Sequence, residues 1–500
     1  MRIEWKEALC NCKLVVNRNG GFGAETLVAM GDFAKEQRTK IKTLVLYSNE
    51  VRGGYSYFVE LLAEANFERI VLIGKAWNGL TLDLFGEVFR FESATSFGQY
   101  AWELIPKHST IALIGHNDKE FDAVEGCLAY CTQISYVEVN LDAIAYNLEV
   151  FRTKLRPGTK TLCMLKAFGY GNGSGTVANT LAANKVDYFG VGTVDEGAEL
   201  RREGILTSIM VLMPSVPNFE KMLRLNLEAV VFSVDFMDKL SRFTQRRAVG
   251  SVPIHLKFDT GMHRMGIEPA QIDDVAKLLQ TSPQFRLVSM MTHLAGSDEA
   301  EFDGFTVEQA NVFEDMCGQM ISLASISYPV MRHILNTHGV SRFPQYQYEM
   351  VRIGLGIYGG STDIQDELQI VSSFSTEIIQ IKHVASGQTV GYSRRGNIDA
   401  YSRIAVLPVG YADGISRKLS GGVGKVWING KLAPIVGNVS MNIISIDITN
   451  IDAKLGDRAY FFAPEYPIDK LAEQLGTIPY EIITAITDRI PRVYFILKKD

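Results

Sequence analysis

The sequence predicts an α/β protein in three parts: an N-terminal Rossmann-like α/β module, a central (β/α)8 barrel of the TIM type, and a C-terminal mostly-β domain. Three observations support this order. Strand-like runs alternate with helical patterns up to about residue 134, the same rhythm continues with longer buried runs to about 368, and short alternating strands follow. We therefore expect domains at 1–134, 135–368 and 369–500.

Composition and charge are those of an ordinary globular chain. Of the 500 residues, 47% are hydrophobic and 21% are charged, and the net charge of −6 argues against nucleic acid as the main partner. There is no apolar run long enough to span a membrane and no signal-peptide core near Met1. The six cysteines lack metal-ligand spacing and are typical of reduced thiols, so we expect a cytoplasmic protein without a metal site.

The N-terminal module contains four strand-like runs, at 42–47, 69–73, 88–91 and 110–114, with helical patterns at 24–36, 55–65, 95–104 and 120–130. A glycine loop at 19–23 lacks the lysine and the hydroxyl residue of a phosphate-binding Walker loop. We expect a glycine-permitted turn before a helix at this point.

Eight apolar runs define the central part, at 161–166, 187–192, 208–213, 228–233, 252–259, 285–294, 331–336 and 350–358. Continuous apolar runs are typical of parallel strands that are covered on both faces. Helical patterns such as 195–203, 271–280 and 307–324 lie between them, which gives the strand count of a (β/α)8 barrel. An open doubly wound sheet is the competing topology, and periodicity does not exclude it.

The C-terminal part contains shorter strand-like runs, at 374–384, 403–409, 425–428, 431–436 and 443–448. Asn429 and Gly430 separate two of these runs, and this dipeptide is a strong signal for a two-residue hairpin turn.

Lys166 is the most informative residue, because it ends an apolar run and precedes the glycine-rich loop 167–175. The missing side chains of such a loop expose backbone N–H groups, which can hold an anion. Desolvation favours the neutral amine, so a lysine there can act as a nucleophile or base near neutral pH. The structural alternative is a surface lysine in a turn.

Polar residues also stand near the ends of other barrel strands, where reactive groups of such barrels lie. These are Lys257, Arg264, His293, Asn336, Thr337 and Arg352, the last at the opening of the eighth strand. Singly, Arg264 could cap a helix, His293 could be a core imidazole and Thr337 a strand-end hydroxyl. Jointly, they predict an active site at one rim.

The β domain adds glycine-flanked tyrosines. Tyr392 lies in Val-Gly-Tyr-Ser, Tyr411 in Gly-Tyr-Ala-Asp-Gly, and Tyr480 follows Pro479 near the end; Met441 lies in Gly-Asn-Val-Ser-Met-Asn. Tyrosines in strands are usually packing residues, but Tyr392 and Tyr411 stand in loop-like segments.

From about residue 135 onward, the chain resembles the alanine racemases, pyridoxal-phosphate enzymes with a barrel and a C-terminal β domain. The resemblance rests on motifs in the family's order: Lys-Ala-x-x-Tyr-Gly, Lys-x-Asp-Thr-Gly-Met-x-Arg, Thr-His-x-Ala, Arg-x-Gly-x-x-x-Tyr-Gly, Val-x-Tyr and Gly-Tyr-Ala-Asp-Gly. Residues 1–134 resemble the C-terminal domain of UDP-N-acetylmuramoyl-tripeptide–D-alanyl-D-alanine ligase, without that ligase's ATP-binding domain. Some bacteria carry this ligase fused ahead of the racemase.

The resemblance implies roles for the singled-out residues. Lys166 would bind pyridoxal phosphate covalently, Arg352 would face the pyridine nitrogen, and His293 would pack against the ring and support Arg352. The remaining cofactor-binding residues would be Tyr170, Asn336, Thr337, Gly354, Leu355 and Tyr480. An always-protonated guanidinium at the ring nitrogen would make the cofactor a milder electron sink.

Racemisation needs a base on each face of the substrate α-carbon. The resemblance implies Lys166 for the D-isomer and Tyr392, from the other subunit of a homodimer, for the L-isomer. Arg264 would help to lower the pKa of the tyrosine and orient the substrate carboxylate. Met441 and Tyr411 would narrow the pocket, and Lys257 matches a lysine that is carbamylated in many relatives.

The sequence departs from the family pattern in two places. Asn172 replaces a common histidine and Phe168-Gly169 a common Asn-Ala pair, and we expect modest effects because both lie beside Lys166. Asn438 and Asn442 replace an arginine and an aspartate around Met441, which bears on the substrate pocket but not on the reaction class.

The implied activity is interconversion of L- and D-alanine, which supplies D-alanine for peptidoglycan. The alternatives are a racemase of another small amino acid such as serine, a related barrel decarboxylase, and a pyridoxal-phosphate carrier protein. The decarboxylases have a cysteine motif opposite the lysine and a polyglycine phosphate loop, and the carrier lacks a β domain. For 1–134, we expect a non-catalytic module that docks to cell-wall enzymes.

Overall fold

The structure is a computed structural model. It describes residues 134–248, 250–360 and 363–497, and residues 2–129 except 9–11, 18–25, 28, 32–38, 40, 50–58, 60, 61, 63–66, 78–85 and 117. The expected glycine turn at 19–23 and most of the expected helices at 24–36 and 55–65 therefore lie outside the described residues. Of the helices that are described, none is long and apolar enough to cross a membrane.

The central sheet has eight parallel strands, and each coincides with a predicted apolar run. They are β8 (Lys160–Met164), β9 (Tyr188–Val191), β10 (Ser208–Val211), β11 (Leu227–Val231), β12 (Val252–Lys257), β13 (Phe285–Met291), β14 (Met331–His333) and β15 (Met350–Ile353). The order is β14-β13-β12-β11-β10-β9-β8-β15, so the first and last strands pair. Between β15 and the chain after β14, the N–H of Arg352 donates to the carbonyl of Leu335 over 3.0 Å. This near-closed ring is the predicted barrel rather than an open sheet.

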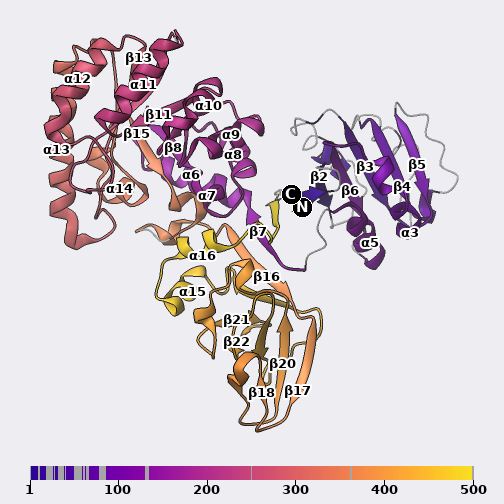
Figure 1. Ribbon diagram of the computed structural model, residues 1–500. Helices are drawn as coiled ribbons and strands as arrows, with labels where there is room; N and C mark the ends of the chain where they lie inside the picture. Colours follow the sequence, from indigo (N-terminus) through magenta and orange to yellow (C-terminus); the bar gives the residue numbers. More distant parts are fainter. Residues whose placement is uncertain are drawn as a thin grey trace.

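Helices connect these strands and cover the barrel (Figure 1). They are α8 (Ser174–Ala183), α9 (Val194–Arg202), α10 (Phe219–Arg224), α11 (Val234–Arg246), α12 (Ile272–Thr281), α13 (Asp303–Leu323) and α14 (Thr337–Arg342), with α6 (Leu141–Thr153) before β8. Helix α9 begins at a capping box in which Thr193 and Glu196 bond each other's backbone N–H groups. The predicted helices at 195–203, 271–280 and 307–324 are confirmed within one to four residues.

The eighth strand is shorter than predicted. It ends at Ile353, and a 3-10 helix, η7 (Leu355–Tyr358), takes the place of residues 355–358. Gly354 between them has ψ −97°, and η7 ends at Gly359 with φ +73°, a left-handed conformation that favours glycine. Arg352 is therefore an interior residue of β15 rather than its opening residue.

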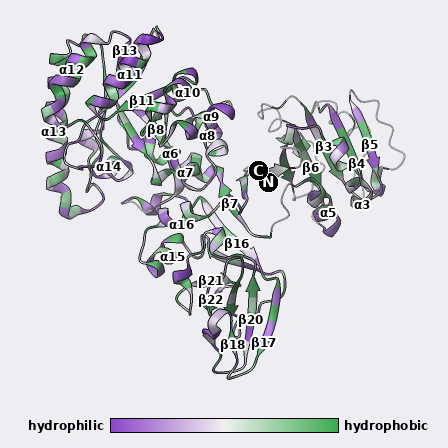
Figure 2. Cartoon of the chain, viewed as in Figure 1, coloured by the Kyte–Doolittle hydropathy of each residue, from purple (hydrophilic) through white to green (hydrophobic). Residues whose placement is uncertain are grey.

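The N-terminal module contains the four predicted strands together with the unpredicted β2, in a parallel sheet of order β2-β6-β3-β4-β5. These are β2 (Cys12–Asn17), β6 (Thr110–Gly115), β3 (Lys42–Tyr47), β4 (Arg69–Ile73) and β5 (Glu87–Phe91). All six residues of β6 are buried, and Figure 2 shows hydrophobic colouring there against the hydrophilic surface of helix α5 (Lys119–Leu128). Two short helices, α3 (Ala94–Gly98) and α4 (Ala101–Leu104), occupy the segment predicted as one helix.

The sequence did not predict β1 (Arg2–Ala8), β2 or β25 (Arg492–Leu497). Strand β1 pairs antiparallel with both β2 and β25, and β25 pairs parallel with β7 (Tyr136–Asn140). The indole of Trp5 stacks on the ring of Tyr494, with ring centroids 5.6 Å apart. One continuous sheet thus joins the N-terminal module to the remainder of the chain, and the two termini lie side by side (Figure 1).

The C-terminal part contains β16 (Ser372–Glu377), β17 (Gln380–Val384), β20 (Ser402–Leu407), β21 (Lys425–Ile428), β22 (Lys431–Val436), β23 (Ile444–Asp447) and β24 (Arg458–Phe462), with helices α15 (Ile468–Leu475) and α16 (Pro479–Ala485). The hairpin at Asn429-Gly430 is confirmed, with φ +45° and +82°. The prediction of one strand over 374–384 is wrong. Strand β16 pairs with β7 and β24, whereas β17 pairs with β20, so the chain changes neighbours at residues 378–379.

Candidate functional site

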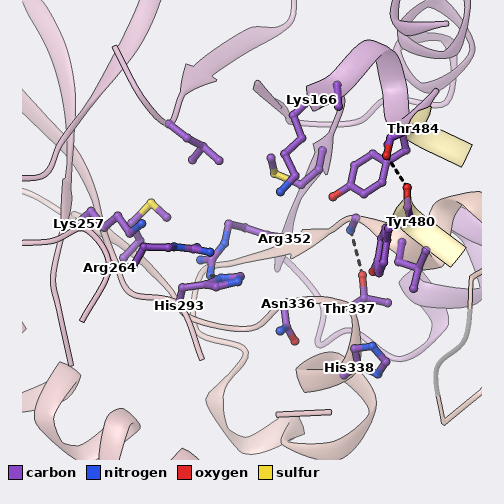
Figure 3. A pocket seen from close by; sticks show the side chains of 17 residues that line it. Lys166, Lys257, Arg264, His293, Asn336, Thr337, His338, Arg352, Tyr480 and Thr484 are labelled. Carbon is purple, nitrogen blue, oxygen red and sulfur yellow. Dashed lines mark hydrogen bonds between the residues drawn. The ribbon is translucent and has the colours of Figure 1, made fainter. Parts of the chain in front are cut away.

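A cavity of about 410 Å³ lies at the ends of the barrel strands (Figure 3). Eleven of the predicted site residues line it, namely Lys166, Tyr170, Lys257, Arg264, His293, Asn336, Thr337, Arg352, Gly354, Leu355 and Tyr480. Residues that the sequence reasoning missed also line it, namely Met164, Ala167, Leu212, Met291, His338 and Thr484. The structure therefore brings the predicted rim residues together around one cavity.

The cavity is built for an anion. Two lysines and two arginines line it, and no carboxylate belongs to its described lining. Figure 3 shows Lys257, Arg264, Arg352 and His293 on one side of the cavity. Thr337 and Tyr480 lie on the other, and Lys166 extends toward the space between. Uncompensated cations around a partly desolvated space attract negative charge strongly.

The same surroundings favour neutral amines at both lysines. Burial, followed by the charge of Arg264, lowers the pKa of Lys166, although Glu196 opposes this shift. Burial and the charges of Arg264 and Arg352 lower the pKa of Lys257 to about 8. Both amines are thus more readily available as bases or nucleophiles than a solvent-exposed lysine.

Arg352 is fixed by backbone carbonyls and imidazoles. Its Nη1 donates to Nδ1 and to the carbonyl of His333 over 2.8 and 2.9 Å. Its Nη2 donates to the carbonyls of Thr292 and Ile334 over 2.7 and 2.9 Å, with Nδ1 of His293 at 3.3 Å. Burial lowers the pKa of Arg352 to about 10, so the guanidinium stays charged at neutral pH. Within the described residues its Nε–H has no protein partner, which leaves this donor for a bound molecule.

His293 is a neutral imidazole. Burial, followed by the charges of Arg352 and Arg264, holds the pKa of His293 well below its ordinary value. The contact of Nδ1 with Arg352 is the one that the resemblance implied for this residue.

The turn that follows Lys166 is left-handed. Ala167, Phe168, Gly169 and Tyr170 all have φ between +53° and +62°, a conformation that costs about 1–2 kcal/mol at each residue other than glycine. Strain of this kind persists only where the surroundings hold it.

Several side chains hold this turn. The carboxylate of Glu196 accepts from the N–H of Ala167 over 2.8 Å. The amide of Asn172, which is buried, donates to the carbonyls of Gly169 and Tyr170 over 3.3 and 3.1 Å, and Ser372 donates to its oxygen. Asn172 is thus a structural part of the turn that carries Lys166, which its place in the sequence did not reveal.

The expectation that the glycine loop presents free N–H groups to an anion is wrong. The N–H groups of Gly169, Gly171 and Gly173 donate to the backbone carbonyls of Leu165, Ala167 and Phe168 over 2.9–3.0 Å. The glycines are needed instead because they adopt positive φ and because neighbouring atoms leave no room for a Cβ. A Cβ at Gly171 would lie 2.3 Å from the carbonyl oxygen of Ile483, and one at Gly173 would lie 1.7 Å from Oη of Tyr494.

A different set of donors surrounds the opposite end of the cavity. The hydroxyl of Thr337 accepts from the N–H of Gly354 over 3.0 Å, and the ring of Tyr170 lies 5.6 Å from that of Tyr480. Within the described residues, neither phenol hydroxyl has a protein partner. A Cβ at Gly354 would lie 2.8 Å from the Tyr170 hydroxyl, so a side chain there would displace this hydroxyl. Burial raises the pKa of both tyrosines, which keeps them protonated donors.

Asn336 lines the cavity and also caps a helix. Its Oδ1 accepts from the N–H of Gly339 and from the hydroxyl of Ser297, over 2.9 and 3.0 Å, and so caps helix α14. This capping presents Thr337 to the cavity.

Tyr392, Tyr411 and Met441 do not line this cavity. They lie in the β domain, where they are 72%, 44% and 54% exposed. Hydrogen bonds bring their segments together: the amide of Asn438 donates to the carbonyl of Tyr392, and the N–H of Tyr411 donates to the carbonyl of Ser440. Three residues predicted to act together are thus exposed on linked segments of the β domain, outside the lining of the cavity of their own chain.

Two family models match the chain: "Alanine racemase, N-terminal domain" over residues 139–362 and "Alanine racemase, C-terminal domain" over residues 371–494. The alanine racemase of Clostridium novyi is 35% identical over 376 residues, which cover 72% of this chain and 95% of that protein. Alanine racemase 1 of Oceanobacillus iheyensis is 33% identical over 374 residues and is covered to 98%.

Solved structures give the same result. The alanine racemase of Clostridium difficile superposes with a TM-score of 0.68 at 29% identity, over 73% of this chain and 97% of that one. A structure from Bacillus anthracis, described as an alanine racemase with bound L-Ala-P, gives a TM-score of 0.68 at 29% identity, over 73% and 96% of the two chains.

Proposed function

The chain belongs to the alanine racemase family, and from this premise we infer that it interconverts L- and D-alanine with pyridoxal phosphate as its cofactor. The observation that carries this conclusion in the molecule itself is Lys166. It has a lowered pKa in a cavity lined by cations and by hydroxyl donors, as a cofactor bearing a phosphate and an aldehyde requires.

The residues present fit that cofactor. The dianionic phosphate needs several donors when desolvated, and the hydroxyls of Tyr170, Tyr480 and Thr337 with the backbone at Leu355 would supply them. Gly354, whose N–H bonds Thr337, leaves the space for the phosphate. Arg352 has one N–H free for the ring nitrogen, and His293 lies beside it. When bound, the cofactor acts as an electron sink that makes the α-proton of the amino acid removable.

We assign proton transfer on one face of the α-carbon to Nζ of Lys166. The lowered pKa supports this role, because a neutral amine accepts a proton near neutral pH. We assign this face to the D-isomer. The neighbouring Arg264 lines the same cavity and is suited to hold the substrate carboxylate, since a guanidinium pairs with two oxygens at once.

We assign the other face to Tyr392 of a second copy of the chain. The high exposure of Tyr392 and its absence from the lining of the cavity support a homodimer in which it completes the neighbouring site. Tyr411 and Met441, on the linked segments, would narrow that site and favour alanine over longer side chains. Activity toward serine is the alternative specificity, and the names of the matched relatives favour alanine.

We propose that Lys257 is carbamylated. Its pKa of about 8 leaves a useful fraction of neutral amine for carbon dioxide, and the product would be an anion facing the cation of Arg264. Because the modification would replace a positive charge at Lys257 by a negative one, it would hold the guanidinium of Arg264 in the cavity by an ion pair.

For residues 1–134, we propose a module related to the C-terminal domain of the D-alanyl-D-alanine-adding ligase. The parallel sheet with flanking helices supports this relationship. We retain the domain division 1–134, 135–368 and 369–500, which is supported by the family-model limits at 139, 362 and 371. The module would act in the cytoplasm by docking, bringing D-alanine production close to the cell-wall enzymes that use it.

The first experiment measures D-alanine formed from L-alanine by purified protein with added pyridoxal phosphate. Lys166→Ala should abolish both turnover and the covalent cofactor absorbance. Lys160→Ala, at the exposed start of the same strand, is the matched control and should retain both. Absence of cofactor binding by the unmodified protein would refute the assignment. Docking would be refuted if deletion of 1–134 left stability and activity intact and the module captured no cell-wall enzyme.

A further inference from the structure

A line of five polar side chains, which we call the relay, runs through the barrel interior. Each of five consecutive strands contributes one of them. Nη1 of Arg352 (β15) lies 2.8 Å from Nδ1 of His333 (β14), and Nε2 of His333 lies 2.9 Å from Oγ of Ser289 (β13). Oγ of Ser289 lies 2.7 Å from Nδ1 of His255 (β12), whose Nε2 lies 2.9 Å from Oε2 of Glu228 (β11). All five are buried.

With one proton on His255, the two ends of this relay fix the direction of every hydrogen bond. A guanidinium only donates, so Nδ1 of His333 must accept, and its Nε2 carries the proton that is donated to Ser289. The hydroxyl of Ser289 then donates to Nδ1 of His255. An ionised carboxylate only accepts, so Nε2–H of His255 donates to Glu228.

The charge states agree with this arrangement. Burial, followed by the charge of Arg352, holds the pKa of His333 well below its ordinary value, so the ring is neutral. Burial alone would raise the pKa of Glu228, but the hydrogen bonds from His255 and Ser208 outweigh it, and the net shift is downward. The relay therefore has a fixed cation, Arg352, at one end and a fixed anion, Glu228, at the other.

We propose that Glu228, His255 and Ser289 are positioning residues for Arg352. They determine which nitrogen of His333 carries the proton, and so keep His333 an acceptor that holds the guanidinium in the cavity. This proposal rests on the proposed function, in which Arg352 faces the ring nitrogen of the bound cofactor. It extends the machinery of the site through three residues that do not line the cavity.

Replacing Glu228 by glutamine removes the negative charge but keeps nearly the same side-chain size. A glutamine amide can donate as well as accept, so His255 is free to carry its proton on Nδ1 instead. Ser289 would then accept from His255 and donate to Nε2 of His333. The remaining proton of His333 would sit on Nδ1, facing the donors of Arg352, and the guanidinium would lose its anchor.

The first readout needs no cofactor. In full-length protein with ¹⁵N-labelled histidine, the imidazole shifts should report His333 as protonated on Nε2 only. Glu228→Gln should convert it to a mixture of tautomers. Ser289→Ala, which removes the link between the two imidazoles, should broaden or shift both rings.

The second readout uses the loaded enzyme. With ¹⁵N-labelled pyridoxal phosphate, either variant should move the ring-nitrogen resonance toward that of a pyridine without a hydrogen-bond donor. We expect kcat to fall by about 10- to 100-fold, as for a misplaced catalytic group, with a smaller change in KM for alanine. Ser241→Ala is the matched control, because this buried serine bonds Ser282 over 2.6 Å outside the relay and should change neither resonance.

The proposal is overturned if Glu228→Gln leaves both the His333 tautomer and the ring-nitrogen resonance unchanged, or if Ser241→Ala alters them equally. Glu228→Gln decides the matter should Ser289→Ala not fold. If the unmodified protein bound no cofactor, the proposed function would fail instead, and the tautomer measurement would still decide the relay.

Discussion

Nε of Arg492 donates to the carbonyl of Gly171 over 2.8 Å, so strand β25 holds the left-handed turn that carries Lys166. The other guanidinium donors go to the carbonyls of Thr487, Ile490 and Ile486 over 2.6–2.8 Å. Beside it, Tyr494 of the same strand packs against Gly173. The reactive lysine therefore depends on a segment that belongs to neither the barrel nor the cavity lining.

Arg492→Lys should destabilise this turn although it keeps the charge. A single ammonium cannot replace a planar fork that serves four carbonyls, and the cost of buried unpaired carbonyls is about 1–3 kcal/mol each. We expect a lower Tm and weaker binding of pyridoxal phosphate, measured by thermal unfolding and absorbance titration. Arg489→Lys, at an exposed arginine that pairs with Asp413, keeps the charge of that pair and should change neither. Unaltered cofactor affinity in Arg492→Lys would contradict the link.

Tyr392→Phe should separate the two faces of the reaction. Removing the hydroxyl eliminates the base that we assign to L-alanine, so exchange of its α-proton with solvent should fall about 100-fold or more, while exchange from D-alanine should fall much less. Proton exchange followed by NMR in deuterated buffer measures both rates. Tyr401→Phe, an exposed tyrosine bonded to His383 in the same domain, serves as control. Equal loss for both isomers would refute the face assignment.

Carbamylation of Lys257 should follow its pKa of about 8. Carbon dioxide adds only to the neutral amine, which makes up roughly a tenth of the population at pH 7 and rises through pH 8. A carbamate resonance from ¹³C-bicarbonate should therefore grow with pH and be absent in Lys257→Met. Its absence from the unmodified protein at about pH 9 would count against the modification.

The lowered pKa of Lys257 also means that its charged form destabilises the folded protein. The unfolded lysine, with its ordinary pKa of about 10.4, binds a proton more tightly than the folded one. Charged Lys257 therefore costs the folded state stability below about pH 8, and this cost diminishes as the pH rises toward 10.4. In protein kept free of bicarbonate, Lys257→Met should flatten the rise of Tm across that window.

Trp5→Ala tests whether the N-terminal module supports the remainder of the chain. Deleting a buried indole costs about 3–5 kcal/mol, and the loss of its stacking on Tyr494 should weaken the pairing of β1 with β25. We expect the cofactor absorbance to be lost at a lower temperature than in the unmodified protein. Trp102→Ala, at a 63% exposed position, should leave that temperature unchanged. If Trp5→Ala also left it unchanged, the module would be mechanically separate.

The barrel and its rim were predictable because their signals are local. Strands covered on both faces require continuous apolar runs, and a lysine or arginine directly after such a run is unlikely to be accidental. The relay was not predictable in this way, because His333, Ser289 and Glu228 stand within or beside apolar runs, where a polar residue has no evident partner. Only the parallel pairing of β11, β12, β13 and β14 brings these residues side by side.

Other features could not be predicted because they depend on contacts between residues that are not neighbours in the sequence pattern. Strand β1 contains charged residues at alternate positions, and its partner β25 lies at the opposite end of the sequence, so neither had a neighbour to identify it. The segment 374–384 was predicted as one strand because its pattern continues across the point where the chain changes partners. Asn172 was underestimated because its importance comes from the φ values of its neighbours, which the residue types do not reveal.

The contact between Arg492 and Gly171 spans 321 residues, and this separation has a consequence during synthesis. At the usual rate of translation, roughly 15 to 60 seconds pass between the emergence of the turn from the ribosome and that of the strand that holds it. For that interval, the growing chain can form barrel strands while its lysine turn lacks its anchor. We therefore expect nascent chains to bind the cofactor poorly until strand β25 has joined the sheet.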